Sequence, residues 1–170
     1  MAHIPELVVL AGGFGTRLRS VVADVPKPLA PVLGKPFLQY QVDHWVRLGI
    51  RSFTFLLYHQ AELIVDFLQR RQAQGGMPGC QVRWVVEPQP LGTGGSIAHA
   101  VKELELRGSF MVTNADTWLG AGPAELAVAP APAMAVIPVE NSARYGRVRV
   151  APGGTVEAFA EKEASTGPGA

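Results

Sequence analysis

The sequence has little cysteine, no long apolar run and no excess of charge of either sign. A single cysteine, Cys80, has no partner in the chain for an internal disulfide, and a metal centre of clustered cysteines is excluded. We interpret Cys80 as a small apolar filler or a surface thiol, not as a nucleophile.

The apolar run at Leu7–Ala11 is too short to span a bilayer and lacks the flanks of a signal peptide, so we expect a cytoplasmic protein with no membrane partner. Fifteen Lys and Arg against 14 Asp and Glu leave a net charge of +1. A chain without a basic field is not expected to bind nucleic acid.

What the sequence does have is enough apolar material for one core. Of its 170 residues 48% are hydrophobic, and a chain of this length buries roughly two-thirds of its unfolded surface. We therefore expect a single domain spanning residues 1–170.

Short apolar runs alternate with segments of helical periodicity. We predict strands at Leu7–Leu10, Phe53–Leu57, Val82–Val86 and Phe110–Thr113. Predicted helices carry Leu38, Val42, Trp45 and Leu48 after Pro36, then Leu63, Ile64, Phe67 and Leu68, and then Ile97, Val101 and Leu104 just past Gly94-Gly95. The alternation predicts a three-layer α/β/α sandwich with a Rossmann-like, mostly parallel sheet, in which ligands gather at the carboxyl ends of the strands.

The last third of the sequence has a different composition from the rest. Residues Gly120–Ala133 are rich in Ala, Pro and Gly, which predicts a loop around at most one short helix. We expect a strand at Met134–Pro138 and a hairpin formed by Arg147–Val150 and Val156–Phe159.

The loop after the first predicted strand is suited to a phosphate. Glycines at positions 12, 13 and 15 let backbone N–H groups close on an anion, and Arg17 supplies a planar fork for phosphate oxygens. The alternative is a tight turn that binds nothing. A dinucleotide fingerprint fails because Leu18 stands where its last glycine belongs, and the Gly-Lys-Ser/Thr of a P-loop does not occur.

A second segment, Pro26-Lys27-Pro28, places a lysine between two prolines that restrict the backbone on both sides. Alone it reads as a surface lysine in a turn. Together, the two segments resemble the sugar-nucleotide pyrophosphorylases, which join an NTP to a sugar 1-phosphate and carry G-G-x-G-T-R-L, a spacer and P-K-P. The resemblance continues, in the family's order, through Glu87-Pro88, Leu91–Ser96, Thr113–Asp116, Tyr145-Gly146 and Glu161-Lys162.

The resemblance implies a fold of the nucleotide-diphospho-sugar transferase type, with a nucleotide-binding part at about 1–119 and a sugar-binding part at about 120–170. It implies catalytic roles for Arg17, Lys27 and Asp116, with Asp116 holding Mg²⁺, a metal that takes one or two carboxylates plus substrate phosphates. The implied nucleotide-binding residues are Leu10, Ala11, Gly12, Gly13, Gly15, Thr16, Arg17, Glu87, Pro88, Gly92, Thr93 and Asn114. Those implied on the sugar-phosphate side are Gly146, Glu161 and Lys162.

Each of these segments also has a plain structural interpretation. Asp116 can cap a turn, the segment Leu91–Ser96 can be a helix N-terminus capped by Thr93 or Ser96, and Glu161-Lys162 can be a solvated pair. The family usually spells Asn-Gly-Asp where this chain has Ala115, and a methyl group there could shift the backbone's approach to the sugar. The family pattern also adds a second metal-binding aspartate and an Asn-Ala-Gly segment beyond the point where this chain ends, so we expect an incomplete C-terminal part.

Within the family, the chain looks most like the D-glycero-α-D-manno-heptose 1-phosphate guanylyltransferases and next like the mannose 1-phosphate guanylyltransferases. The resemblance implies GTP, a sugar 1-phosphate and Mg²⁺ as reactants and cofactor. A non-catalytic nucleotide or sugar-phosphate sensor on the same fold and a molybdopterin guanylyltransferase are alternatives; Arg17, Lys27 and Asp116 argue against the sensor. The residues decide neither the base, nor the sugar, nor whether the protein is a homo-oligomer.

Overall fold

The computed structural model describes residues 4–15, 24–140 and 146–160. The chain divides into two compact units, unit 1 at Met1–Ala133 and unit 2 at Met134–Ala170.

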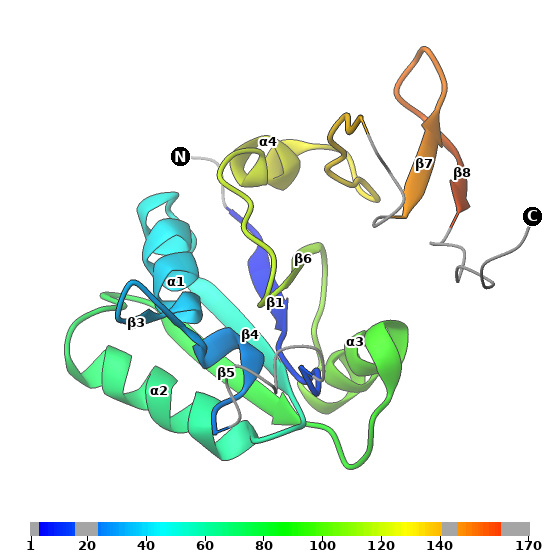
Figure 1. The fold of residues 1–170 in the computed structure, drawn as a ribbon. Coiled ribbons are helices and arrows are strands. Elements are labelled where there is room, and N and C mark those ends of the chain that lie inside the picture. The colour runs from blue at the N-terminus through cyan, green and yellow to red at the C-terminus, as the bar shows by residue number, and fades with distance from the viewer. Residues whose placement is uncertain (1–3, 16–23, 141–145, 161–170) are drawn as a thin grey trace, which may run out of the picture. The chain divides into compact units, whose positions relative to one another are not determined.

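Unit 1 is built on a four-stranded sheet of order β5-β4-β1-β6. Its strands are β1 (Glu6–Leu10), β4 (Ser52–Leu57), β5 (Gln81–Val86) and β6 (Phe110–Asn114), and all neighbours run parallel (Figure 1). The four predicted strands are confirmed. Because β1 pairs with β4 on one side and β6 on the other, it lies inside the sheet, which explains its short, continuous apolar run.

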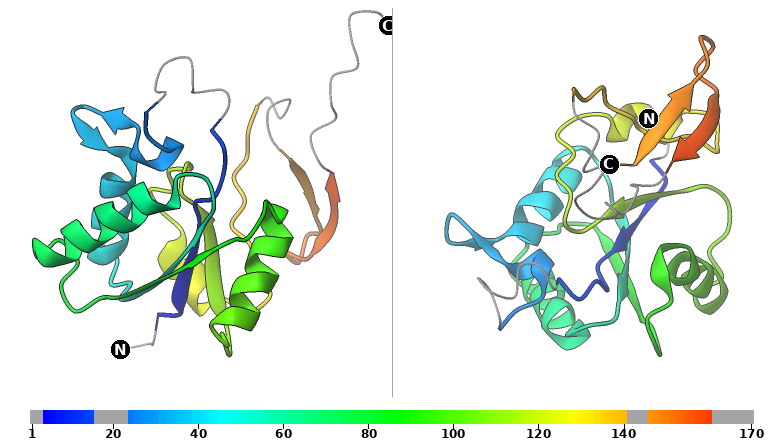
Figure 2. Two further views of the ribbon diagram at one scale, coloured as in Figure 1. Left: turned by 90° about the horizontal axis from the view of Figure 1, so that it is seen from below. Right: turned by 45° about the vertical axis from the view of Figure 1, so that its right-hand side comes forward.

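Helices cover both faces of this sheet. Helices α1 (Phe37–Arg47) and α2 (Ala61–Ala73) lie on one face, and α3 (Gly92–Glu103) lies on the other (Figure 2). Alternate residues of β1 serve the two sides: Val9 belongs to the core under α1 and α2, and Val8 to the core under α3. The predicted three-layer arrangement is confirmed. Among the described residues, no helix has the length and apolar character that crossing a bilayer requires.

A small structure between β1 and α1 was not predicted. It comprises a 3₁₀ turn, η2 (Lys27–Leu29), and two short antiparallel strands, β2 (Pro31–Val32) and β3 (Lys35–Pro36). Pro28 is buried, and the Phe37 amide donates to the Ala30 carbonyl at 3.0 Å. These contacts attach Lys27 to the start of α1.

The start of α3 differs from the prediction. The helix begins at Gly92, not after Gly95, and neither Thr93 nor Ser96 caps it; Leu91 is the N-cap and makes no side-chain capping bond. The Ser96 hydroxyl donates to the Glu87 carboxylate at 2.6 Å, and the Leu91 amide donates to the same carboxylate at 2.9 Å, so the first turn of the helix is held against the end of β5. Tertiary contacts thus override the low helix propensity of glycine.

The segment after β6 contains one short helix, α4 (Pro123–Val128), as predicted. The strand predicted at Met134–Pro138 is wrong, because the structure shows no regular element there. Met134, Val136 and Ile137 are 49%, 50% and 73% exposed. An apolar segment becomes a strand only where a neighbouring strand accepts its backbone hydrogen bonds, and no described strand pairs with this one.

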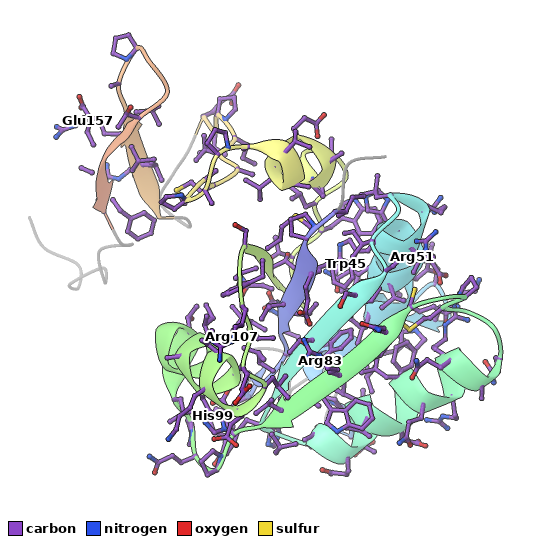
Figure 3. All side chains as sticks on the ribbon, turned by 180° about the vertical axis from the view of Figure 1, so that it is seen from behind. Trp45, Arg51, Arg83, His99, Arg107 and Glu157 are labelled. Carbon is purple, nitrogen blue, oxygen red and sulfur yellow. The ribbon has the colours of Figure 1, made fainter. Side chains whose placement is uncertain are left out.

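The hairpin predicted in unit 2 is confirmed. Strands β7 (Arg147–Val150) and β8 (Val156–Ala160) pair antiparallel, with a bulge between Arg149 and Val150. An ion pair of 3.1 Å joins Arg149 to Glu157 across the hairpin. Figure 3 shows Glu157 on this hairpin.

Phe55 should carry a large share of the stability of unit 1. It is fully buried on β4, and its ring stacks on Phe53 with centroids 6.4 Å apart. We expect Phe55→Ala to lower the free energy of unfolding by about 3–5 kcal/mol, because the substitution leaves a cavity. Denaturant unfolding followed by tryptophan fluorescence measures this, since Trp45, Trp84 and Trp118 all lie in unit 1.

The matched control is Phe159→Ala, which removes a 56% exposed ring from unit 2. It should change the same transition by no more than about 0.5 kcal/mol. Equal losses in both variants would contradict the assignment of the core.

Candidate functional site

Four loops meet at the carboxyl edge of the sheet in unit 1. They follow β1, β4, β5 and β6, and they bring Gly12, Tyr58, Glu87 and Asp116 to the same edge because the strands are parallel. This is the edge at which such sheets bind ligands.

The loop after β1 fits closely between its neighbours. A Cβ on Gly12 would lie 3.1 Å from the Tyr58 backbone nitrogen and 3.4 Å from Glu87 Oε1, so a side chain there would crowd both. A Cβ on Gly13 would meet nothing within 4 Å. The first glycine therefore serves packing against β4 and β5, and the second leaves open space above the loop.

The same loop touches the Pro-Lys-Pro segment. Gly15 has φ +59°, a left-handed conformation that favours glycine, and a Cβ there would lie 3.1 Å from Lys27 Cβ. The glycine loop and Lys27, which the sequence suggested as two parts of one site, are thus in contact.

Lys27 and Asp116 form an ion pair at this edge. Lys27 Nζ donates to Asp116 Oδ2 at 2.6 Å, although the two residues are 89 positions apart. Both side chains remain partly open to solvent, 37% and 39% exposed. The structure brings these two predicted catalytic residues together; their catalytic roles stay predictions.

The carboxylate of Glu87 is hydrogen-bonded within the protein. It is 7% exposed, and its carboxylate accepts a hydrogen bond from the Ser96 hydroxyl at 2.6 Å and from the Leu91 amide at 2.9 Å. A buried carboxylate needs such donors. Glu87 therefore holds the loop before α3 against the end of β5, and Pro88 beside it is exposed.

The beginning of α3 presents backbone to solvent. Gly92, Thr93 and Gly94 are exposed, and a Cβ on Gly92 or Gly94 would meet nothing within 4 Å. The unpaired N–H groups of a first helical turn thus lie at the edge that also carries the glycine loop.

Asp116 is suited to a metal that is shared with a ligand. Its partly exposed carboxylate follows Asn114, the last residue of β6, and Thr117 Oγ1 lies 3.3 Å from Oδ1. The described part of the chain contains no group of three or more His, Cys, Asp or Glu that could hold a metal on its own. One carboxylate completed by phosphate oxygens and water fits Mg²⁺, which keeps several waters and rarely occupies an all-protein cage.

Ala115, which departs from the family's usual glycine, is 1% exposed and belongs to the core under α1 and α2. Its amide donates to the Leu10 carbonyl at 2.9 Å. The methyl group therefore contributes to packing beneath the edge.

Several predicted residues cannot be placed in the site. Thr16, Arg17, Glu161 and Lys162 lie outside the described residues. Gly146 lies in unit 2, where a Cβ would come within 2.9 Å of Phe159 Cζ, so its smallness serves packing in the hairpin.

Cys80 is half-buried, and its Sγ lies 3.6 Å from the Pro78 carbonyl. Burial raises the pKa of the Cys80 thiol above its ordinary value, and Arg51 offsets only part of that rise. A thiol with a raised pKa stays protonated at neutral pH, which agrees with the interpretation of Cys80 as a residue that is not a nucleophile.

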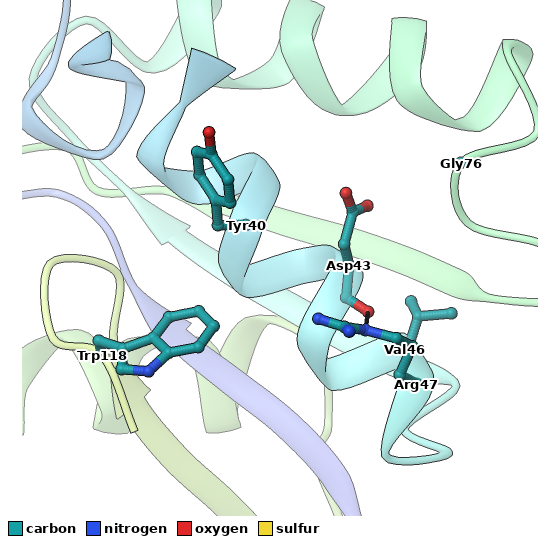
Figure 4. Close-up of a pocket in the computed structure, with 6 residues that line it drawn as sticks. All are labelled: Tyr40, Asp43, Val46, Arg47, Gly76 and Trp118. Carbon is teal, nitrogen blue, oxygen red and sulfur yellow. Dashed lines mark hydrogen bonds between the residues drawn. The ribbon is translucent and has the colours of Figure 1, made fainter. Parts of the chain in front are cut away.

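A separate hollow of about 490 Å³ lies along α1 (Figure 4). It is lined by Tyr40, Asp43, Val46, Arg47, Gly76 and Trp118. None of the predicted site residues lines it, and we assign no substrate to it.

Two sets of residues at the edge escaped the sequence analysis. Phe14, which belongs to the glycine loop, contacts Tyr58 edge to face with 5.6 Å between the ring centroids. Its centroid lies 5.4 Å from that of His59, so the three rings form an aromatic cluster. Gln41 on α1 is buried against the turn that carries Asp116. A signal existed for Gln41, because it stands three residues after Leu38 and four before Trp45, on the apolar face of the helix.

Comparison with known families agrees with this geometry. The sequence model of the family described as Nucleotidyl transferase matches residues 6–166. The chain belongs to the nucleotidyl transferase family.

Relatives of this nucleotidyl transferase include two curated guanylyltransferases. D-glycero-alpha-D-manno-heptose 1-phosphate guanylyltransferase from Campylobacter jejuni is 30% identical over 158 residues, covering 92% of this chain and 68% of the relative. Mannose-1-phosphate guanylyltransferase from Mycobacterium tuberculosis is 37% identical over 125 residues, covering 73% of this chain and 33% of the relative. The chain thus spans about two-thirds of one relative and a third of the other.

The crystal structure of HddC from Yersinia pseudotuberculosis complexed with GMP-PN has the same fold. It aligns with a TM-score of 0.76 at 30% identity, covering 93% of this chain and 69% of HddC.

The side chains of Glu87 and Ser96 should contribute to stability together, because they share a buried hydrogen bond. Glu87→Gln replaces an acceptor by a donor, so one of the two buried donors loses its partner, and we expect a loss of about 1–3 kcal/mol in the free energy of unfolding. A double-mutant cycle with Ser96→Ala should give a coupling energy of about 0.5–3 kcal/mol. Unfolding in urea measures all four corners of the cycle.

Glu103→Gln, an exposed substitution on the same helix, is the control and should change stability by less than about 0.5 kcal/mol. Strict additivity of the Glu87 and Ser96 losses would show that the hydrogen bond between the two side chains does not help to hold the loop.

Proposed function

We propose that this nucleotidyl transferase joins GTP to D-glycero-α-D-manno-heptose 1-phosphate, giving a GDP-sugar and pyrophosphate. The observation that carries the proposal is the Lys27–Asp116 pair at the carboxyl edge of the sheet, with Lys27 also in contact with the glycine loop at Gly15. A cation and a metal-binding carboxylate side by side are what two phosphorylated substrates and Mg²⁺ require.

The proposed reaction needs no general base. A phosphate monoester has a second pKa of about 6, so the sugar phosphate oxygen is already a nucleophile at neutral pH. It forms a bond to the α-phosphorus in line with the bond that breaks, and the electron pair of that bond leaves with pyrophosphate. Catalysis then consists of positioning two polyanions and stabilising the charge at phosphorus.

This chain's residues divide that work in the proposal. Lys27 contacts the α-phosphate or the incoming phosphate, Arg17 binds the triphosphate, and Lys162 meets the sugar phosphate. Asp116 is the carboxylate that would hold Mg²⁺. When bound, Mg²⁺ adds positive charge beside the phosphate oxygens.

The ion pair gives each of the two charges a partner of opposite sign. Lys27 and Asp116 each act as the counter-ion of the other at 2.6 Å. In the proposal, Lys27 would contact a phosphate oxygen and Asp116 would hold Mg²⁺. In that arrangement each charge would again have a partner of opposite sign.

The choice of substrates rests on the relatives. The Campylobacter relative is a manno-heptose 1-phosphate guanylyltransferase, and the HddC structure was solved with GMP-PN. Mannose 1-phosphate is the second candidate sugar, favoured by the 37% identity to the Mycobacterium enzyme. Both substrates are anions that do not cross membranes freely, and we place the reaction in the cytoplasm.

The test of the function is pyrophosphate release across four NTPs and several sugar 1-phosphates, including mannose and manno-heptose. We expect turnover with GTP and a manno-configured sugar, lost when Mg²⁺ is chelated. Turnover with UTP or TTP instead would overturn the guanine assignment. Binding of GTP with no turnover in the whole grid would favour a nucleotide sensor.

The ion pair is tested by Lys27→Met and Asp116→Asn. Each should lower kcat by about 10²-fold or more, because Lys27→Met removes a positive charge that faces the reacting phosphates and Asp116→Asn weakens the ligand that would hold Mg²⁺. Lys35→Met, on the exposed strand β3, is the control for loss of a lysine and should keep the activity of the wild type. Circular dichroism verifies that all variants fold, and wild-type activity in Lys27→Met would remove Lys27 from the mechanism.

A further inference from the structure

One buried polar side chain faces the turn that carries Asp116. Gln41 lies on α1 among the buried residues Leu38, Val42 and Trp45, and it is itself only 1% exposed. An amide in an apolar core destabilises a protein unless it is hydrogen-bonded. Its partners therefore indicate what it does.

The amide of Gln41 reaches both ends of that turn. Nε2 donates to the Thr117 carbonyl at 2.8 Å and lies 3.4 Å from the Asn114 carbonyl. The contact to Thr117 is a hydrogen bond of ordinary length, and the contact to Asn114 is longer than the usual range. Asp116 lies between the two contacts, so Gln41 bridges the segment that presents its carboxylate.

The turn has little else to close it. Its own backbone bond, from the Thr117 amide to the Asn114 carbonyl, is 3.5 Å long, well beyond the usual range for N–H···O. The bond from Ala115 to Leu10 fixes where the turn begins, and Gln41 fixes where it ends.

The orientation of the amide supports this interpretation. Gln41 Oε1 is buried and has no hydrogen-bond partner among the described residues. Rotating the amide by half a turn would place this oxygen against two carbonyl oxygens, so the NH₂ group must face the turn. The side chain therefore presents its donors to the turn.

A second residue of α1 contacts the same segment. The His44 ring packs against Trp118, with 4.9 Å between the ring centroids. His44 follows Gln41 by three residues, so both project from one face of the helix. Helix α1 thus contacts the Asp116 turn and the residue just after it.

We propose that Gln41 is a positioning residue, which acts through the Asn114–Thr117 turn to hold the Asp116 carboxylate where Mg²⁺ and a nucleotide phosphate can share it. The proposal rests on the proposed function.

The first test is the Mg²⁺ dependence of GTP affinity in Gln41→Met, which keeps the length of the side chain and removes its donors. Calorimetric titrations with Mg²⁺ and with EDTA give the two affinities. We expect the affinity for GTP in the presence of Mg²⁺ to fall about 10–100-fold, because losing a partner that orients a metal ligand has an effect of this size. The affinity for GTP in EDTA should change less than about twofold.

The matched control is Val42→Ala, the neighbouring and fully buried residue of the same helix. It destabilises α1 by leaving a cavity but makes no hydrogen bond to the turn. Thermal unfolding ranks the two variants for stability. Equal losses of Mg²⁺-dependent affinity in both would show that Gln41 matters for folding alone and would overturn the proposal.

The second test needs neither metal nor activity. Trp118 is 49% exposed and Trp45 is 4% exposed, so iodide quenching in a Trp84→Phe background reports mainly on Trp118. Gln41→Met should change the quenching constant clearly, because the released turn moves Trp118 from His44, and Val42→Ala should not. Unchanged quenching together with unchanged Mg²⁺ dependence would also overturn the proposal.

The two tests separate the two claims. A wild-type chain that binds no GTP with or without Mg²⁺ would overturn the proposed function, and with it the role of Gln41 toward the metal. The quenching result would still decide whether Gln41 holds the turn. Normal wild-type binding with no effect of Gln41→Met overturns the role of Gln41 and leaves the proposed function standing.

Discussion

The parallel pairing of β1 between β4 and β6 is the constraint on which the rest of unit 1 depends. Parallel strands require crossovers, which place helices on both faces of the sheet and all carboxyl ends at one edge. A glycine loop, a buried glutamate and an aspartate that are far apart in the chain therefore meet without any special contact to bring them together. Their shared edge follows from the direction of the strands.

The edge is supported by groups that themselves touch no substrate in our proposal. Glu87 ties the start of α3 to the end of β5 through Ser96 and Leu91. Gln41 ties α1 to the turn after β6. One support comes from each layer of helices, so the loops on which the chemistry is proposed are fixed from both faces of the sheet. Rigid support of this kind lets a partly exposed ion pair keep its geometry.

The sequence predicted the strands and helices of unit 1 well because burial dominates there. Runs such as Phe53–Leu57 are apolar on both faces, and the pattern has few other interpretations. The prediction was wrong where contacts with another segment of the chain decided which secondary structure forms. Glycines at positions 92, 94 and 95 indicated a loop, yet they belong to α3, whose first turn Glu87 holds through Leu91 and Ser96. Apolar residues at Met134–Pro138 indicated a strand, yet no described strand pairs with them.

The sequence by itself determined the alternating α/β pattern, the motif segments and the residue types of the candidate site, because strand burial and motif spacing are local properties. Only the tertiary structure decided which of those residues meet. It placed Lys27 against Asp116, assigned both oxygens of Glu87 to internal bonds and identified Gln41 as the partner of the Asp116 turn. Hydrogen bonds and ion pairs between distant segments depend on distances of a few ångströms, which no linear spacing encodes.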